Sequence, residues 1–120
     1  MKRIVSLVAA LAVAAVTVFA VVAYAGPSTA TGTTVKVAAK DTFRFTLSRK
    51  SAPHGKVTFK VTNKGRLKHD FKIAGKRTKM LKHNQTATLT VTLKKGKKYT
   101  YLCTVPGHAA AGMKGTFKAT

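Results

Sequence analysis

Hydrophobic and polar residues alternate along most of the chain after residue 34. A period of two places successive side chains on opposite faces of an extended segment, so each alternating run predicts a β-strand with one buried face. Six such runs lie at residues 35–37, 43–47, 57–61, 71–73, 89–93 and 99–103, and Phe117 marks a seventh predicted strand. In the fifth run the polar positions are threonines, which is typical of exposed strand surface.

Segments with turn-forming residues separate these runs, and most of them contain Gly or Pro. Short strands joined by such turns predict a small all-β domain, an antiparallel β-sandwich of about seven strands. Residues 76–84 are polar and long for a hairpin, so we expect a loop or a short helical turn there. No helical period of useful length is visible after residue 34.

The N-terminal segment has a different pattern. Lys2 and Arg3 precede an uncharged run at residues 4–24, which ends in Ala-Tyr-Ala at residues 23–25. A basic start, an apolar stretch and a small-x-small ending predict a signal peptide over residues 1–25. A retained membrane anchor is the alternative, because about 20 apolar residues can span a bilayer. We therefore expect an exported protein in the periplasm or on the outer side of the cell envelope, with a membrane-tethered form as the alternative.

The exported part is expected to hold one domain. Residues 26–34 are rich in Gly, Pro, Ser, Thr and Ala, a composition that predicts a flexible leader. Residues 35–120 are enough for one domain and not for two.

The chain is strongly basic. Lys and Arg number 23 against two acidic residues, a formal charge of +21 that becomes +19 without Lys2 and Arg3. Export removes nucleic acid as an ordinary partner, and the basic residues are scattered through the strand pattern. We expect a solvated cationic surface that favours redox partners with acidic docking surfaces. Association with a membrane or with anionic cell-wall polymers is a further expectation.

A candidate metal site lies near the C-terminus. Cys103 is the only cysteine, so no intrachain disulfide can form, and a solitary thiol in an exported protein is a candidate metal ligand. Cys103, His108 and Met113 follow one another at five-residue steps. A thiolate, an imidazole and a thioether together suit copper. Calcium and magnesium prefer oxygen ligands, and structural zinc normally binds more cysteines.

A trigonal copper site with one thiolate needs a second imidazole. His69 is the best candidate, because it lies where the loop at residues 63–68 runs into a predicted strand that can pair with the strand ending at Cys103. His54 and His83 lie in polar turns without partner spacing, so we expect neither to bind metal. Met80 lies in a lysine-rich stretch and is expected to be exposed.

These motifs resemble those of a known family. The segments His69-Asp70-Phe71 and Tyr101-Leu102-Cys103, followed by Pro106-Gly107-His108 and Met113, are similar to those of plastocyanin-like cupredoxins. The four-residue spacings within the ligand loop look most like the auracyanin type, and the resemblance covers residues 35–120. It implies a Greek-key β-sandwich, one copper ion cycling between Cu(I) and Cu(II), and electron transfer without substrate turnover.

The resemblance also implies roles for the ligand residues. Cys103 would form the dominant bond, the two histidines would complete a trigonal plane, and Met113 would be a weak axial ligand. Backbone donors, including the amide of residue 70, would stabilise the sulfur. The ring edge of His108 would be the electron port, inside an apolar rim formed by Leu67, Pro106 and residues 109–111.

One position departs from the family pattern. Asp70 stands where the family often has Asn, whose side chain ties the two ligand loops together. A carboxylate can still accept backbone hydrogen bonds, but the donor of the amide is lost.

The main functional hypothesis is a monomeric one-electron carrier in the cell envelope. One alternative is a copper-handling protein, although such proteins commonly use Met-rich or His-rich tracts and only Met80 and Met113 remain after export. Another is a basic binder of anionic envelope polymers. We expect no enzyme, because the domain has no carboxylate pair or nucleophile–base arrangement and four ligands leave no open position for a substrate.

Overall fold

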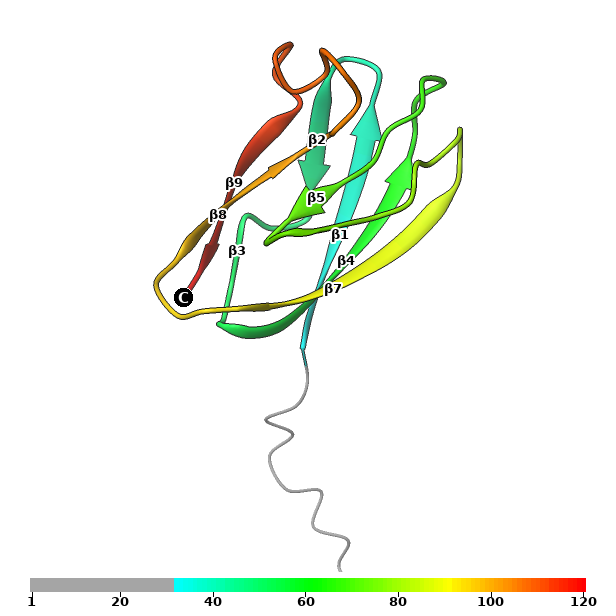
Figure 1. Cartoon of the computed structure of the whole chain (residues 1–120). Coiled ribbons are helices and arrows are strands. Elements are labelled where there is room, and N and C mark those ends of the chain that lie inside the picture. Colours follow the sequence, from blue (N-terminus) through cyan, green and yellow to red (C-terminus); the bar gives the residue numbers. More distant parts are fainter. Residues whose placement is uncertain (1–31) are drawn as a thin grey trace, which may run out of the picture.

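The computed structural model describes residues 32–120 and contains nine β-strands and no α-helix in that range. The predicted signal peptide and most of the predicted leader lie outside the described residues. The strands form two sheets that pack face to face (Figure 1). Within residues 32–120, no helix is long and apolar enough to cross a membrane.

The first sheet has four strands. Their order is β2 (Arg44–Leu47), β1 (Thr33–Lys40), β4 (Gly55–Asn63) and β7 (Thr86–Leu93). β1 runs antiparallel to β2 but parallel to β4, which in turn is antiparallel to β7. β1 begins at Thr33, so this strand includes the last two residues of the segment predicted as a leader.

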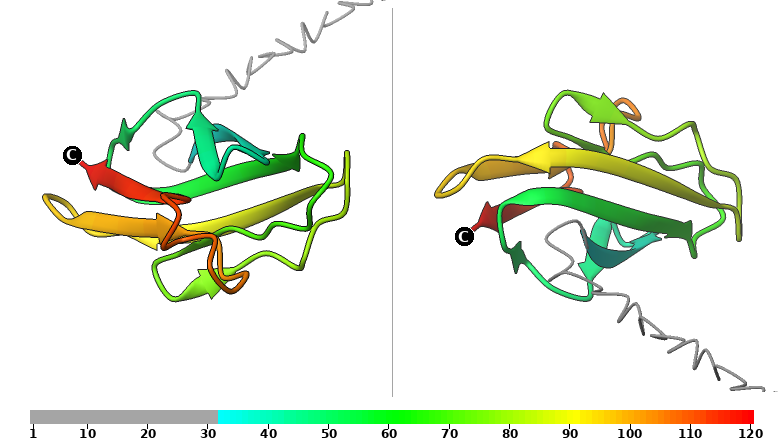
Figure 2. Two further views of the ribbon diagram at one scale, coloured as in Figure 1. Left: turned by 90° about the horizontal axis from the view of Figure 1, so that it is seen from above. Right: turned by 90° about the horizontal axis from the view of Figure 1, so that it is seen from below.

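The second sheet has five strands. Their order is β3 (Ser51–Ala52), β9 (Lys114–Ala119), β8 (Lys98–Leu102), β5 (Lys72–Ile73) and β6 (Lys76–Arg77). β3 and β9 are parallel, and the other pairs are antiparallel. Figure 2 shows β8 and β9 side by side from above and from below.

The predicted β-sandwich is confirmed, with nine short strands in place of seven. All seven predicted strands overlap observed strands, and the two additional strands are β3 and β6. Each of these has only two residues, too few to show a period in the sequence. Five of the seven strand pairings among the described residues are antiparallel, as expected, and the other two are parallel. Residues 76–84 contain β6 and a loop with one hydrogen-bonded turn, in which the Gln85 amide donates to Lys82 O at 3.0 Å, and they contain no helix.

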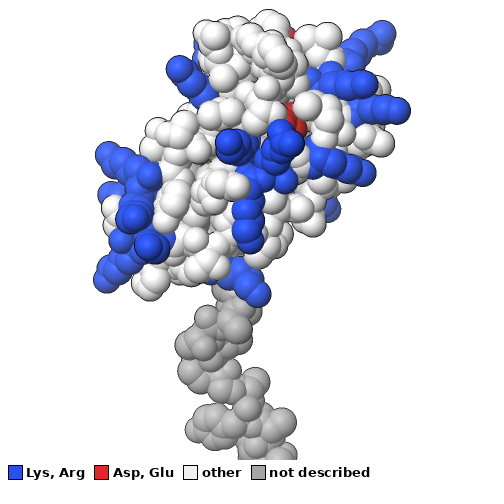
Figure 3. All heavy atoms as spheres, in the orientation of Figure 1, with Lys and Arg blue, Asp and Glu red and all other residues white. Residues whose placement is uncertain are grey.

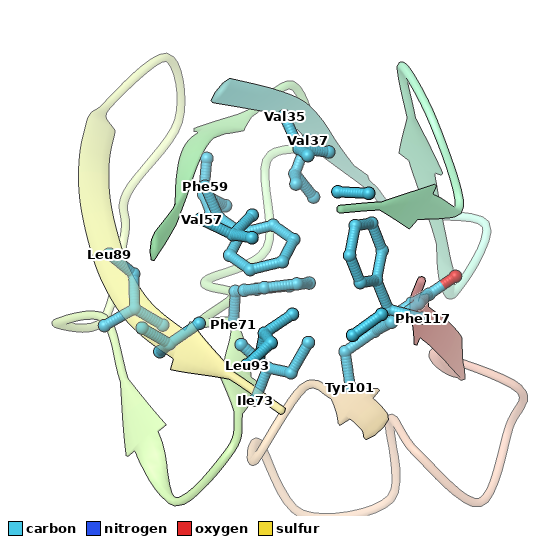
Figure 4. Packing of buried hydrophobic residues seen from close by; sticks show 14 of the residues in the cluster. Val35, Val37, Val57, Phe59, Phe71, Ile73, Leu89, Leu93, Tyr101 and Phe117 are labelled. Atoms are coloured by element: carbon cyan, nitrogen blue, oxygen red, sulfur yellow. The ribbon is translucent and has the colours of Figure 1, made fainter. Parts of the chain in front are cut away.

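Aromatic side chains from both sheets fill the core (Figure 4). The Phe59 ring from β4 lies 5.2 Å from that of Phe71 and 5.2 Å from that of Phe117, measured between centroids. Tyr101 stacks on Phe71 at 5.5 Å. Full burial of each large apolar side chain contributes about 1.5–3 kcal/mol. This core fixes the positions of the strands from which the loops at the upper end of Figure 1 extend.

Candidate metal centre

Three potential ligand atoms converge at one end of the sandwich. His69, Cys103 and His108 each place one ligand atom within 4.8 Å of the others. The two Nδ1 atoms are 3.2 Å apart. Cys103 Sγ lies 3.6 Å from Nδ1 of His108 and 3.9 Å from Nδ1 of His69. Both imidazoles therefore direct the same ring nitrogen towards the thiol.

Strand pairing brings His69 and Cys103 together from distant parts of the sequence. β5 pairs with β8 through Lys72 and Leu102, as the sequence predicted for these two segments. The backbone of His69 makes two hydrogen bonds with that of Leu81. The His69 amide donates to Leu81 O at 3.2 Å, and the Leu81 amide donates to His69 O at 2.8 Å. These contacts hold His69 in a fully buried position.

The loop between β8 and β9 supplies the other ligand residues. The backbone amide of Cys103 donates to Met113 O at 3.1 Å, and the amide of Met113 donates to His108 O at 3.0 Å. Gly112 has a φ of 114°, a backbone conformation that favours glycine. The Met113 side chain is buried and packs in a small cluster with Cys103 and Ala39, so the loop returns all three ligand residues to one place.

The donor set and spacing fit a metal ion. Nitrogen and sulfur ligands lie about 2.0–2.3 Å from a first-row ion such as zinc, so three of them in a plane are roughly 3.5–3.8 Å apart. The separations of 3.2, 3.6 and 3.9 Å between the ligand atoms fall close to this range. Two imidazoles, a thiolate and a neighbouring thioether form the set expected for copper.

Burial affects the protonation of this cluster in the metal-free chain. Burial raises the pKa of the Cys103 thiol, and the Asp70 carboxylate adds to this rise, whereas the backbone amides of Asp70 and Val105 oppose it. That the amide of residue 70 stabilises a metal-bound sulfur stays a prediction. Burial, followed by the neighbouring charge of His69, lowers the pKa of His108. The His108 imidazole and the Cys103 thiol are therefore neutral over a wider pH range than they would be when exposed to water.

Asp70 ties the two ligand loops together. Its carboxylate accepts a hydrogen bond from the backbone amide of Thr104 at 2.6 Å and a short hydrogen bond from the Thr104 hydroxyl. Asp70 is buried beside His69, and Thr104 follows Cys103. The expectation that the carboxylate accepts backbone hydrogen bonds is therefore confirmed.

The turn between β1 and β2 also contributes to the site, and this was missed from the sequence. Asp41 Oδ1 lies 3.0 Å from Nε2 of His69. The ring of Phe43 packs edge-on against the ring of His108, with centroids 5.0 Å apart and an interplanar angle of 67°. The sequence did contain a signal for this contribution, because Asp41 is one of only two acidic residues in a strongly basic chain.

The other histidines lie outside the cluster. Nδ1 of His54 contacts Thr120 O at 2.9 Å, and Nδ1 of His83 contacts Gly65 O at 2.8 Å. Neither belongs to the ligand cluster of the described residues, as the sequence predicted. Met80 is 42% exposed, which also agrees with the prediction.

The predicted apolar rim is at the surface. Leu67 is 47% exposed, and Pro106 is exposed as well. Ala109 is half-buried, whereas the next two alanines are exposed. His108 itself is half-buried, in contrast to the fully buried His69.

Solved structures of copper proteins share this fold. A reduced auracyanin from Roseiflexus castenholzii superposes with a TM-score of 0.66 at 22% identity, covering 74% of this chain and 98% of its own. Auracyanin A from Chloroflexus aurantiacus gives a TM-score of 0.63 at 18% identity, covering 75% and 100%. An azurin from Methylomonas sp. strain J gives a TM-score of 0.60 at 18% identity, and the match covers 75% of this chain and 99% of the azurin.

Sequence comparison assigns the chain to a family. A search of curated proteins found no significant match. The family of copper binding proteins described as the plastocyanin/azurin family matches residues 29–120. The cofactor is one copper ion, and the site consists of His69, Cys103, His108 and Met113. Because the match spans most of the sequence and the donor set fits the metal, this chain belongs to the plastocyanin/azurin family of copper-binding proteins.

Proposed function

We propose that this protein carries single electrons between redox partners in the cell envelope. Copper, when bound, supplies the one-electron chemistry by alternating between Cu(II) and Cu(I). The observation that carries the proposal is the unequal burial of the two histidines. His69 is fully buried with Cys103, whereas His108 reaches the surface beside exposed alanines. An electron can therefore enter through one ligand edge while the other ligands stay shielded from water.

Each ligand residue has a distinct role in this proposal. When copper is bound, the Cys103 thiolate would be the strongest donor, with the imidazoles of His69 and His108 and the weaker thioether of Met113 as the other ligands. The amides of Asp70 and Val105 would stabilise the negative charge on the sulfur.

Hydrogen bonds within the ligand loops support fast transfer. The Cys103–Met113 and Met113–His108 backbone contacts restrain one loop, and the Asp70–Thr104 contacts link it to the other. Ligand atoms held in this way need little movement when the charge on the metal changes. We infer no catalytic residue and no enzymatic activity, since this arrangement transfers charge without converting a substrate.

Cationic side chains near His108 favour an acidic partner. The guanidinium of Arg44 lies against Gly112 in the ligand loop, since a Cβ at Gly112 would be 3.0 Å from Nη1 of Arg44. Arg66 and Lys68 flank Leu67 on the neighbouring loop and are exposed. Figure 3 shows many Lys and Arg side chains and very few acidic atoms on the visible face. An apolar centre with basic neighbours suits a small, transient interface with a redox protein that has an acidic docking surface.

The predicted signal peptide supports the envelope location. A separate observation favours a second candidate function, which is contact with anionic envelope polymers. A shallow hollow of about 420 Å³ on the outer face of the first sheet is lined in part by Lys36, Lys60 and Lys64. Lys36 and Lys60 are direct cross-strand partners, an arrangement of like charges that a bound anion would relieve. Weakened sedimentation with purified anionic wall polymer in Lys36→Glu and Lys60→Glu would support this second role, and unchanged sedimentation would refute it.

The test of the main proposal is a Cu(II) titration of the purified chain, followed by visible absorption and electron paramagnetic resonance. We expect an intense blue band and a narrow copper hyperfine splitting, both lost in Cys103→Ser and His69→Ala. His54→Ala is the matched control, because His54 lies outside the cluster, and it should titrate like the unaltered chain. The blue protein should then exchange one electron reversibly at an electrode.

Two results would contradict this proposal. An ordinary tetragonal copper spectrum would favour copper handling in place of electron transfer. Absence of Cu(II) binding, together with retained binding to anionic polymers in Cys103→Ser, would favour the polymer-binding function.

A further inference from the structure

Asp41 contacts the buried ligand histidine on the side that faces away from the cluster. Its Oδ1 is 3.0 Å from Nε2 of His69, while Nδ1 of the same ring points towards Cys103 and His108. The Asp41 side chain is 38% exposed and that of His69 is fully buried. The carboxylate therefore covers the outer edge of the His69 ring.

The loop after β4 fixes this carboxylate in place. The backbone amide of Arg66 donates to Oδ2 of Asp41 at 2.7 Å, and the amide of Leu67 donates to Oδ1 at 3.1 Å. Gly65 leaves the space for the group, because a Cβ there would lie 2.6 Å from Cγ of Asp41. Both backbone amides donate to the side-chain oxygens, an arrangement that suits an ionised carboxylate, which can only accept hydrogen bonds.

This contact determines which nitrogen of His69 carries the proton. An ionised carboxylate can only accept a hydrogen bond, so Nε2 must be the donor. In the neutral ring the lone pair then resides on Nδ1, the atom that faces Cys103. A carboxylate on the outer nitrogen also makes the ligating nitrogen more basic, and a more basic donor stabilises Cu(II) more than Cu(I).

We infer that Asp41 is a positioning residue of the copper centre, which holds His69 as the Nε2–H tautomer and lowers the reduction potential by strengthening its Nδ1 as a donor. This inference rests on the copper site described above, yet its first part concerns the metal-free chain. The β1–β2 turn is then a third segment of the site, beside the two loops that supply the ligands.

The tautomer can be tested without copper. Two-bond ¹⁵N–¹H correlation spectra of the metal-free chain resolve the ring nitrogens of its four histidines, and His69→Ala assigns the signals of His69. We expect the Nε2–H pattern for His69 and a shift towards a tautomer mixture in Asp41→Ala. Thr42→Ala, an exposed change in the same turn, is the matched control and should leave the pattern unaltered. An Nδ1–H pattern in the unaltered chain would overturn the inference, whatever the copper titration shows.

The effect on the metal is tested with Asp41→Asn, which keeps an oxygen acceptor but removes the charge. Loss of such an outer partner typically lowers metal affinity by about 10- to 100-fold. If the affinity for Cu(I) is unchanged, each tenfold loss of Cu(II) affinity raises the reduction potential by about 59 mV. We expect a higher potential in Asp41→Asn and an altered remote-nitrogen coupling in pulsed electron paramagnetic resonance. Unchanged potential and coupling in a folded variant would refute the tuning role.

Gly65→Ala provides an independent route to the same state, because the added Cβ must displace the Asp41 carboxylate. We expect this variant to raise the potential as Asp41→Asn does. In an Asp41→Ala background the Gly65→Ala change should add little to the potential. Full additivity of the two changes would contradict a shared action through the carboxylate.

Discussion

Thr104 donates both its backbone amide and its hydroxyl to the carboxylate of Asp70, with the amide at 2.6 Å. The two residues each follow a ligand, Asp70 after His69 and Thr104 after Cys103. Since Asp70 is 1% exposed, water cannot replace these partners without opening the site. The pair therefore links the two ligand loops on the side of the thiol, just as Asp41 supports His69 on the opposite side.

Asp70→Ala should destabilise the metal-free chain by about 2 kcal/mol, because hydrogen bonds to charged groups contribute about 1.5–3 kcal/mol and the Thr104 donors lose their acceptor. Asp70→Asn retains one oxygen acceptor and should lose less. Urea unfolding measures both values. A double-mutant cycle with Thr104→Val is the control, and simple additivity of the two changes would show that the hydroxyl–carboxylate hydrogen bond does not contribute to stability.

Met113→Leu should preserve the fold and raise the reduction potential of the copper-loaded chain. Leucine nearly matches the volume of methionine, so the buried site stays filled at a cost below about 1.5 kcal/mol. It offers no sulfur, and the loss of a weak axial donor destabilises Cu(II) more than Cu(I). Cyclic voltammetry measures the change. Met80→Leu alters an exposed methionine and should leave the potential unchanged, while an equal effect from both variants would argue against axial ligation.

The stability of the metal-free chain should fall as the pH is lowered through about 6.5. Burial and His69 lower the pKa of His108 from its ordinary 6.5, so just below that value the unfolded chain binds more protons than the folded chain. Stability therefore rises with pH in this window and is lost as the pH falls. Urea midpoints between pH 7.5 and 5 test this. His108→Gln should weaken the dependence, and an unchanged slope in this variant would assign the effect to another group.

Oxidation of the reduced, copper-loaded protein by hexacyanoferrate(III) should become slower as salt is added. The basic surface near His108 attracts this anion, and salt screens the attraction. Reversing two nearby charges with Arg44→Glu and Lys68→Glu should lower the low-salt rate roughly three- to tenfold. Stopped-flow absorption at the blue band measures the rate. Lys95→Glu combined with Lys97→Glu is the matched control, since it reverses the same number of charges in the β7–β8 turn at the other end of the sandwich (Figure 1). An equal slowing by this control would show that only net charge matters.

Much of the fold could be predicted from local patterns. The alternating runs around Phe59 and Phe117 give strands because a two-residue period is a property of the extended backbone itself. The strands at Ser51–Ala52 and Lys76–Arg77 could not be predicted, since two residues carry no period and their pairing depends on neighbours distant in sequence. The parallel pairing of β1 with β4 was missed because a two-residue period predicts a strand but does not specify its partner or its direction.

The donor chemistry of this protein can be read from the residue types of one segment. Cys103, His108 and Met113 are close together in one loop, and their thiolate, imidazole and thioether limit which metal they can bind. How His69 meets them, and which groups support it, depends on the packing of the whole domain. The Asp41–His69 contact joins residues 28 positions apart, and no local pattern specifies such a distance. It exists because the core sets the two sheets against each other and brings the β1–β2 turn, the loop after β4 and the ligand loop to one end of the sandwich.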